Sequence, residues 1–199
     1  MARCSAGTMP VLIITRVRRS GFTLVEASIT LAVMAVLGAI ATPSLSSLVA
    51  RQRLLGAAHH LQADIALARH ESGRRGQPVT LRFQPGHQWC YALSTGPPVD
   101  CRHDSAGRAS GMIKVVQAAD HPNIDLLDAS AMALDAGSGA SLQSLLAGGH
   151  ARFGLRESQG LPGPMQVQVR LGPQGRGSLC APAAPVAGTA ACPAALPAS

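Results

Sequence analysis

Aromatic residues are scarce in this 199-residue sequence, which contains one tryptophan, one tyrosine and three phenylalanines. Motifs of the common enzyme classes are missing as well. His59, His60 and His70 lack the H-E-x-x-H spacing of a zinc protease, no C-x-x-C pair is present, and no local signature surrounds a nucleophilic serine. The glycine-rich run 172–177 follows a strand-like segment and does not open a helix, which is what a phosphate loop requires. The sequence therefore predicts neither an enzyme nor a cofactor or metal site.

Acidic residues are absent from the first 21 residues, whereas this segment contains four arginines: Arg3, Arg16, Arg18 and Arg19. Without the segment, the formal net charge of +7 falls to +3 (7 − 4). An apolar run from Phe22 to Thr42 follows directly. A run of about twenty apolar residues matches a hydrocarbon core about 30 Å thick. We therefore predict one membrane-spanning segment, with the arginines on the cytoplasmic side and the carboxyl-terminal domain outside the inner membrane.

Glu26 is the only charged residue in this apolar run. A lone carboxylate is costly in lipid and needs a partner. Cleavage after Gly21 would give Phe22 a free amino group, which Glu26 of the same subunit or of a neighbouring one could neutralise. The alternative is an ordinary secretory signal peptide that is cut after residues 39–41, a small-x-small site, and this alternative leaves Glu26 without a role.

The residues around Gly21 form a short motif. Arg18 and Arg19, followed by Gly-Phe-Thr-Leu-Val-Glu at 21–26, resemble the class III signal of type IV pilins and pseudopilins. This resemblance implies that prepilin peptidase cleaves between Gly21 and Phe22, that Phe22 is N-methylated, and that the apolar segment is retained. It also implies a bacterial inner-membrane protein that joins a filament with other pilins or pseudopilins.

A single long helix is predicted from residue 22 to about residue 72, interrupted at Gly38 and Pro43 because proline removes a helical hydrogen bond. Five apolar residues recur on one face at helical spacing: Leu54, Ala58, Leu61, Ile65 and Ala68. This face is expected to pack on a sheet. His60 and Asp64 are four positions apart and are interpreted as an exposed pair.

Alternating apolar residues and turn signals predict several short antiparallel strands. The predicted strands are 79–83 and 89–93 as one hairpin, 112–118, 123–127, 151–153, and 166–171 with 176–180 as a second hairpin. Trp89 and Tyr91 are two positions apart, so they share one face; they are interpreted as core residues, with stacking on a ligand as the alternative. Residues 136–149 are too rich in small residues for an assignment. The predicted fold class is α+β, with a long amino-terminal helix packed on an antiparallel sheet.

Residues 61–81, together with Arg152-Phe153 and Gly175-Arg176, resemble the GspH/FimT family of minor pseudopilins. The resemblance implies a pilin-like fold. The chain is then divided into a leader at 1–21, a transmembrane or filament-core helix at 22–42, a periplasmic domain at 43–180, and an alanine- and proline-rich tail at 181–199. The implied function is that of a structural subunit of a type II secretion pseudopilus or a type IV pilus.

Five cysteines are present, and Cys4 lies in the predicted leader. The other four lie in the part predicted to be exported, where disulfides form: Cys90, Cys101, Cys180 and Cys192. Three pairings are possible, and we favour Cys90 with Cys101 and Cys180 with Cys192, because each bond closes a short loop. A zinc site at Cys101 and His103 is the alternative.

DNA binding during natural transformation is a second functional hypothesis. Some FimT-type proteins are associated with DNA binding through a Gly-Arg-x-Arg motif near the carboxyl end, and residues 175–178 of this chain read Gly-Arg-Gly-Ser. The second arginine of the motif is missing. Four arginines could still contact the phosphates of double-stranded DNA if they gather on one surface: Arg152, Arg156, Arg170 and Arg176. The alternative is that Arg176 is a solvated turn residue.

Overall fold

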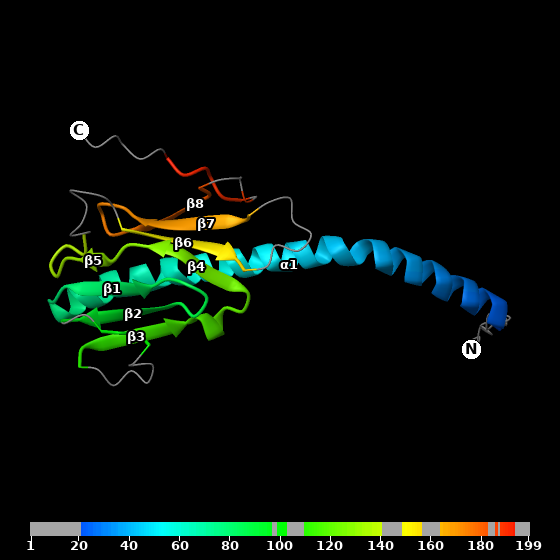
Figure 1. The fold of residues 1–199 in the computed structure, drawn as a ribbon, viewed down its shortest axis with the longest axis horizontal. Coiled ribbons are helices and arrows are strands. Elements are labelled where there is room, and N and C mark those ends of the chain that lie inside the picture. Colours follow the sequence, from blue (N-terminus) through cyan, green and yellow to red (C-terminus); the bar gives the residue numbers. More distant parts are fainter. Residues whose placement is uncertain are drawn as a thin grey trace, which may run out of the picture. The chain divides into compact units, whose positions relative to one another are not determined.

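The computed structural model describes residues 21–96, 99–102, 110–140, 149–156, 164–182, 186 and 188–193, apart from the side chains of residues 40–44. The predicted leader ahead of Gly21 and His103 of the alternative zinc site lie outside the described residues. The chain divides into two compact units, residues 1–41 and 42–199. The second unit contains the described strands and the carboxyl-terminal half of the long helix (Figure 1).

Helix α1 spans Leu24–Arg75. It is followed by Gly76, whose φ of 61° lies in the left-handed region that favours glycine after a helix. The prediction of one long helix is confirmed. The backbone stays helical through Gly38 and Pro43, so neither residue ends the helix, and the kink or weaker hydrogen bonding expected at the proline stays a prediction. A proline removes one hydrogen bond, and the turns on either side are enough to continue a helix of this length.

The first sheet has the strand order β3-β2-β1-β5. Its strands are β1 (Val79–Gln84), β2 (Cys90–Thr95), β3 (Met112–Gln117) and β5 (Met132–Leu134), and the short 3-10 helix η1 (Ala118–Asp120) follows β3. The predicted β1–β2 hairpin is confirmed, with Val79 opposite Thr95 and Gln84 opposite Cys90. β5 is not predicted from the sequence, because alternation cannot be recognised over only 3 residues.

The second sheet has the strand order β4-β6-β7-β8, and neighbouring strands are antiparallel. Its strands are β4 (Ile124–Ala129), β6 (His150–Leu155), β7 (Gln166–Leu171) and β8 (Gly177–Cys180). The predicted second hairpin is therefore confirmed as β7–β8. The short strand predicted at 151–153 is the middle of the longer β6. The α+β class is confirmed, and the antiparallel strands are divided between two sheets (Figure 1).

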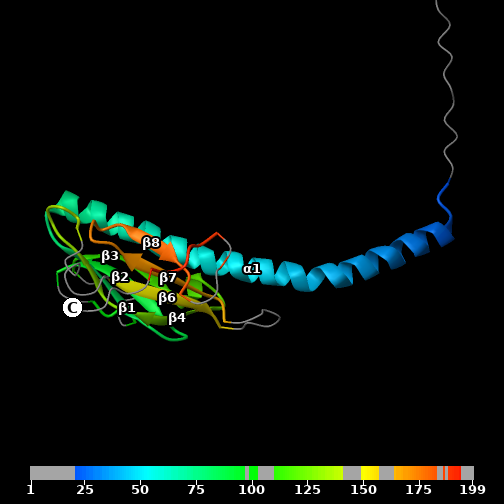
Figure 2. The same ribbon diagram turned by 90° about the horizontal axis from the view of Figure 1, so that it is seen from above.

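The core lies between the carboxyl-terminal half of α1 and the two sheets, which lie on one side of this part of the helix (Figure 2). All residues of the predicted apolar helix face are 0% exposed: Leu54, Ala58, Leu61, Ile65 and Ala68. They belong to one continuous cluster with the buried faces of both sheets, including Leu81 of β1 and Val169 of β7. The amphipathic pattern thus predicted correctly which helix face is buried.

Three of the few aromatic residues, Trp89, Tyr91 and Phe153, lie together in this core. Trp89 and Tyr91 are each 1% exposed, and their rings stack at an interplanar angle of 2° with centroids 6.2 Å apart. Phe153 of β6 meets the Trp89 ring edge-on at 5.5 Å. Trp89 Nε1 donates a hydrogen bond to the Ile124 carbonyl oxygen at 2.7 Å. Because both rings are buried and partnered, they serve the core and are not available to stack on an external ligand.

Candidate functional site

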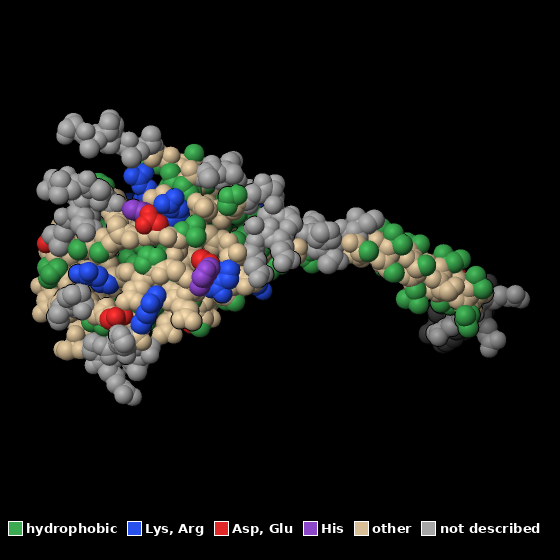
Figure 3. All heavy atoms as spheres, viewed as in Figure 1, with side chains coloured by type: hydrophobic (Ala, Val, Ile, Leu, Met, Phe, Trp, Pro, Cys, Tyr) green, Lys and Arg blue, Asp and Glu red, His purple; other side chains and the backbone are tan. Residues whose placement is uncertain are grey.

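Apolar side chains remain exposed along the amino-terminal part of α1. Phe22 is 76% exposed and Leu24 is 88% exposed. Seven further large apolar side chains are exposed in the same segment: Val25, Ile29, Leu31, Val33, Met34, Val36 and Leu37. Figure 3 shows these hydrophobic side chains along this part of the helix. Because water disfavours a contiguous apolar surface of this kind, the segment needs an apolar partner from outside the chain.

A membrane-spanning helix is not found among the residues that the structure describes: none of their helices is both long enough and apolar enough. The segment predicted at 22–42 therefore stays a prediction.

Glu26 lies in the first turn of α1, next to the residue that caps the helix. Thr23 Oγ1 accepts a hydrogen bond from the Glu26 backbone N–H at 3.2 Å. Thr-x-x-Glu is the sequence pattern of a capping box, and a carboxylate is favourable near a helix amino terminus. Thr23 and Glu26 thus also have a local role, which is to cap the amino terminus of α1. This role was not predicted, although the Thr-x-x-Glu pattern is visible in the sequence. The Glu26 side chain is exposed in the isolated subunit, where a cation from outside can reach it.

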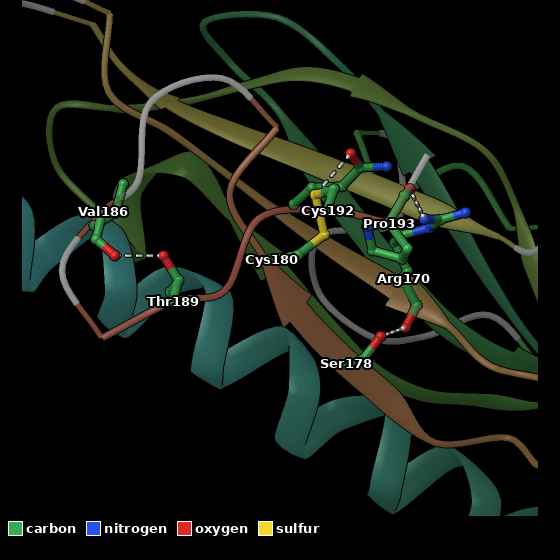
Figure 4. Close-up of a disulfide and its surroundings, with 8 residues drawn as sticks. Arg170, Ser178, Cys180, Val186, Thr189, Cys192 and Pro193 are labelled. Atoms are coloured by element: carbon green, nitrogen blue, oxygen red, sulfur yellow. Dashed lines mark hydrogen bonds between the residues drawn. A yellow bond between two sulfur atoms is a disulfide. The ribbon is translucent and has the colours of Figure 1, made fainter. Parts of the chain in front are cut away.

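Two disulfides join the cysteines in the pairing favoured from the sequence. The bond between Cys90 and Cys101 forms a small buried cluster with Ala92 on the outer face of β2. The bond between Cys180 and Cys192 ties the segment after β8 back to the end of that strand (Figure 4). The Cys192 backbone N–H also donates to the Ala181 carbonyl oxygen at 3.0 Å. The described part of the tail, predicted to be irregular, is therefore held against the second sheet.

Arg152 and Arg170 lie on the outer face of the second sheet, because they alternate with buried residues along β6 and β7. Arg170 Nη1 donates to the Pro193 carbonyl oxygen at 3.0 Å (Figure 4). Arg152 Nη2 donates to Asp128 Oδ2 at 3.0 Å, and His150 Nε2 lies 2.9 Å from the same oxygen. His150 and then Arg152 lower the pKa of Asp128, so its carboxylate is ionised at neutral pH and offsets the positive charge of Arg152.

Arg156 follows β6 and contacts a different carboxylate. Its Nε donates to Asp125 Oδ1 at 2.9 Å, and its Nη2 donates to the His87 carbonyl oxygen at 2.7 Å. His87 Nδ1 lies 2.6 Å from the other oxygen of Asp125. Asp125 is 5% exposed, so Arg156 neutralises a buried charge. This arginine has a structural partner already.

Arg176 lies in a different place, on the β7–β8 turn against the last turns of α1. Gly175 in this turn has a φ of 69°, and a Cβ there would collide with the Gly139 backbone oxygen. Gly177 comes so close to α1 that a Cβ would lie 3.1 Å from Ile65 Cδ1. Gln62 Nε2 donates to the Gly177 carbonyl oxygen at 2.7 Å. Gly177 is thus required by the close approach of the turn to α1, and Gly175 by its positive φ and by the nearby backbone of Gly139.

An open groove of about 860 Å³ lies between this turn and α1. Basic residues line one part of this groove: Arg69, His70, Arg74 and Arg176. Small or polar residues form the rest of the lining: Gln62, Ala66, Gly73, Gly175 and Gly177. Arg74 and Arg75 bind Glu71 and lower its pKa to about 2. Within the described part of the chain, the side chains of Arg69 and Arg176 form no hydrogen bond or ion pair. We call this feature the basic groove.

The four arginines considered for DNA binding therefore occupy separate environments. Arg152 and Arg170 share the outer face of the second sheet, Arg156 binds Asp125, and Arg176 lies in the basic groove. Basic side chains on the face seen in Figure 3 lie beside acidic ones. The structure brings Arg176 together with arginines of α1, which sequence reasoning did not consider.

A buried polar cluster between α1 and the first sheet was also missed. Asp64 is 2% exposed and accepts hydrogen bonds from the Tyr91 hydroxyl and from Lys114 Nζ, each at 2.7 Å. The predicted pair of His60 and Asp64 is present, with His60 Nε2 3.9 Å from Asp64 Oδ2, but the prediction that it is exposed is wrong for Asp64, which is buried. Burial and then the Asp64 carboxylate raise the pKa of Tyr91, so its hydroxyl remains a donor. The signal was present in the sequence, since Asp64 continues a series of buried positions at spacings of four, three and four: Ala57, Leu61, Asp64 and Ala68.

Two protein-family models match the chain. The model described as type II transport protein GspH matches residues 57–178, and the prokaryotic N-terminal methylation motif matches residues 16–42. The chain therefore belongs to the GspH family of minor pseudopilins. This is a family of structural subunits of pili and pseudopili, not one known for enzymes.

Among solved structures, the chain is similar to the type IV minor pilin FimU of Pseudomonas aeruginosa strain PAO1. One crystal form gives 15% identity over 68% of this chain and 91% of FimU, with a TM-score of 0.45. Another gives 16% identity over 67% of this chain and 94% of FimU, with a TM-score of 0.41. Among curated protein sequences, none matches this chain.

Proposed function

We propose that this chain is a minor subunit of a type II secretion pseudopilus or a type IV pilus. In this proposal, prepilin peptidase cleaves after Gly21 and the new amino terminus at Phe22 is methylated. Segment 22–42 anchors the subunit in the bacterial inner membrane, and residues 43–180 with the tail 181–199 lie in the periplasm. The subunit leaves the membrane when α1 packs among the helices of other pilins or pseudopilins.

The exposed apolar surface of residues 22–37 carries this proposal. The buried core consists of residues from Leu54 onward, and the exposed apolar side chains of residues 22–37 are not members of it. Helices of neighbouring subunits present the same kind of surface, so burial of one against another is favourable. Glu26 then lies where a neighbouring Phe22 amino group can neutralise it, which sets the axial position of each subunit.

Processing is tested by the mass of the mature chain. The full chain, produced in cells that contain prepilin peptidase, is expected to begin at Phe22 and to carry one methyl group on its amino terminus. Gly21→Val should block cleavage, because the peptidase requires a small residue before the cut, whereas Gly38→Ala should leave it unchanged. A mature chain that begins after residue 41 would instead identify a secretory signal peptide and would contradict the proposal.

DNA binding in DNA uptake is the second candidate function, and the basic groove is the observation that favours it. Arg69 and Arg176 have no acidic partner among the described residues, and both line one groove with Arg74. Unpaired guanidinium groups bind phosphate oxygens by charge and by paired N–H donors. The arginines of α1 could thus supply the contact that the missing second arginine of the Gly-Arg-x-Arg motif would make.

Salt dependence tests this candidate. The full chain in mild detergent is expected to bind duplex DNA with an affinity that falls steeply as salt rises. Arg176→Gln should weaken binding for all DNA sequences alike and reduce the slope of log affinity against log salt by about 1. Arg53→Gln removes an equal charge from an exposed position of α1 outside the groove and is the matched control. Equal losses in both variants, or no binding at low salt, would count against a DNA site in the groove.

A further inference from the structure

Two histidines extend the buried cluster around Asp64 into one hydrogen-bonded chain. His60 Nδ1 of α1 lies 2.9 Å from Nε2 of His121, in the turn after η1. His60 Nε2 lies 2.9 Å from Lys114 Nζ of β3, which also donates to Asp64. The hydrogen bonds therefore connect α1 to β3 and to the turn after η1. We call His60, Asp64, Tyr91, Lys114 and His121 the histidine cluster.

The donors and acceptors of this cluster determine where its protons lie. The ammonium group of Lys114 can only donate, so His60 Nε2 must accept. A neutral His60 then carries its proton on Nδ1 and donates to Nε2 of His121, which must also accept. The hydrogen bonds thus require Nε2 of His60 and Nε2 of His121 to be acceptors, while the Asp64 carboxylate lies 3.9 Å from His60 Nε2. A proton added to either ring places two donors opposite each other.

The surroundings of His121 also disfavour its charged form. Burial and then the neighbouring His60 lower the pKa of His121, with Lys114 acting in the same direction and Asp120 and Asp64 acting against it. The Trp89 ring stacks on His121 with centroids 5.8 Å apart and an interplanar angle of 18°. The titratable groups facing the two imidazoles come from α1, β2, β3 and η1: Asp64, Tyr91, Lys114 and Asp120.

We propose that the histidine cluster is a pH-sensitive clamp that holds the first sheet and the turn after η1 against α1. At neutral pH Nε2 of His121 accepts the hydrogen bond from His60 and the clamp is closed. In mildly acidic medium, protonation of His121 at Nε2 places two donors opposite each other and breaks this hydrogen bond. The turn then separates from α1, and Trp89 loses the ring that covers it.

The direction of the pH effect follows from proton binding. Histidine of the unfolded chain takes up a proton near pH 6.5, whereas His121 of the folded chain does so at lower pH. Below about pH 6.5 the unfolded state therefore binds more protons, and stability falls as the pH decreases through this window. The folding equilibrium constant falls by up to about tenfold per pH unit while His121 stays neutral in the fold. Above this window His121 is neutral in both states, so it contributes no pH dependence to stability.

The single tryptophan of the chain reports on the clamp, because Trp89 stacks on His121. We expect the emission of the full chain in mild detergent to shift to the red and to weaken as the pH falls from about 8 to about 5, with a midpoint below about 6.5. His121→Gln keeps an acceptor that does not titrate, and it should abolish this transition. His59→Gln removes an exposed histidine of the same helix and should retain it.

Denaturant unfolding gives a second readout. The unfolding midpoint of the wild type should decrease from about pH 7 to about pH 5 by more than that of His121→Gln. Should His121→Gln fail to fold, His121→Asn replaces it, since the asparagine amide oxygen is also an acceptor that does not titrate. A wild type whose emission stays constant over this range while its helical circular dichroism is retained would overturn the proposal. A transition of the same size in the His121 variant would overturn it as well.

Discussion

Replacing Glu26 with alanine or leucine should leave the protein in the membrane fraction and remove it from filaments. The apolar segment keeps its length and becomes more apolar, so insertion is not impaired. Within a filament, however, the amino group of a neighbouring Phe22 would be buried without its partner. Breaking a buried ion pair by removing one partner costs about 3–5 kcal/mol, which lowers incorporation by about two to four orders of magnitude. Immunoblots of membrane and sheared-filament fractions measure both quantities.

Ser28→Ala is the matched control for this experiment. Ser28 lies in the same part of α1, and its hydroxyl donates to the Val25 carbonyl oxygen of its own helix at 2.7 Å. Loss of such an intrahelical bond leaves no partner in a neighbouring subunit unsatisfied. The variant should therefore enter filaments like the wild type. Normal incorporation of Glu26→Ala would remove Glu26 from the mechanism of subunit alignment.

Trp89→Ala should have the largest effect on the stability of the domain. The ring is 1% exposed and contacts three other rings: Tyr91, His121 and Phe153. Truncation removes these contacts, leaves a cavity and deprives the Ile124 carbonyl oxygen of its donor. Such changes cost about 3–5 kcal/mol, a large share of the stability of a typical domain. Denaturant unfolding followed by circular dichroism measures the loss.

Leu127→Ala is the control for core truncation, because Leu127 is a large apolar residue of β4 that is 47% exposed. Its removal should change the free energy of unfolding by less than about 1 kcal/mol. A loss of similar size in both variants would show that the aromatic cluster is not the main stabilising element of the domain.

The elements with strong periodicity were predictable. The buried face of α1 follows from apolar residues at helical spacing, and the two hairpins follow from alternation on either side of Pro85-Gly86 and of residues 172–175. The helix face and the hairpins depend on residues that are close together in the sequence, so they can be predicted from short sequence patterns. The division into two sheets is different, because it depends on which distant strands pair, as in the contact of β4 with β6.

The candidate sites were predictable to different degrees. The motif around Gly21 is a continuous stretch, so it could be recognised without a fold. The acidic partners of the arginines could not be predicted, because Arg152 binds Asp128 and Arg156 binds Asp125 across strands that are far apart in the sequence. The basic groove is likewise formed only when the β7–β8 turn approaches α1. The spacing of Asp64 predicts its burial, but only the fold reveals that Lys114 neutralises it.

The short loops closed by the two disulfides have a consequence for maturation. The bonded cysteines are 11 and 12 positions apart, and the first pair precedes the second in the chain. In the proposed export, with the amino terminus retained in the cytoplasm, Cys90 and Cys101 reach the oxidising side together before Cys180 and Cys192 emerge. Each cysteine then meets its native partner before any other. The domain can thus be oxidised one pair at a time during translocation, without an isomerase to repair crossed bonds.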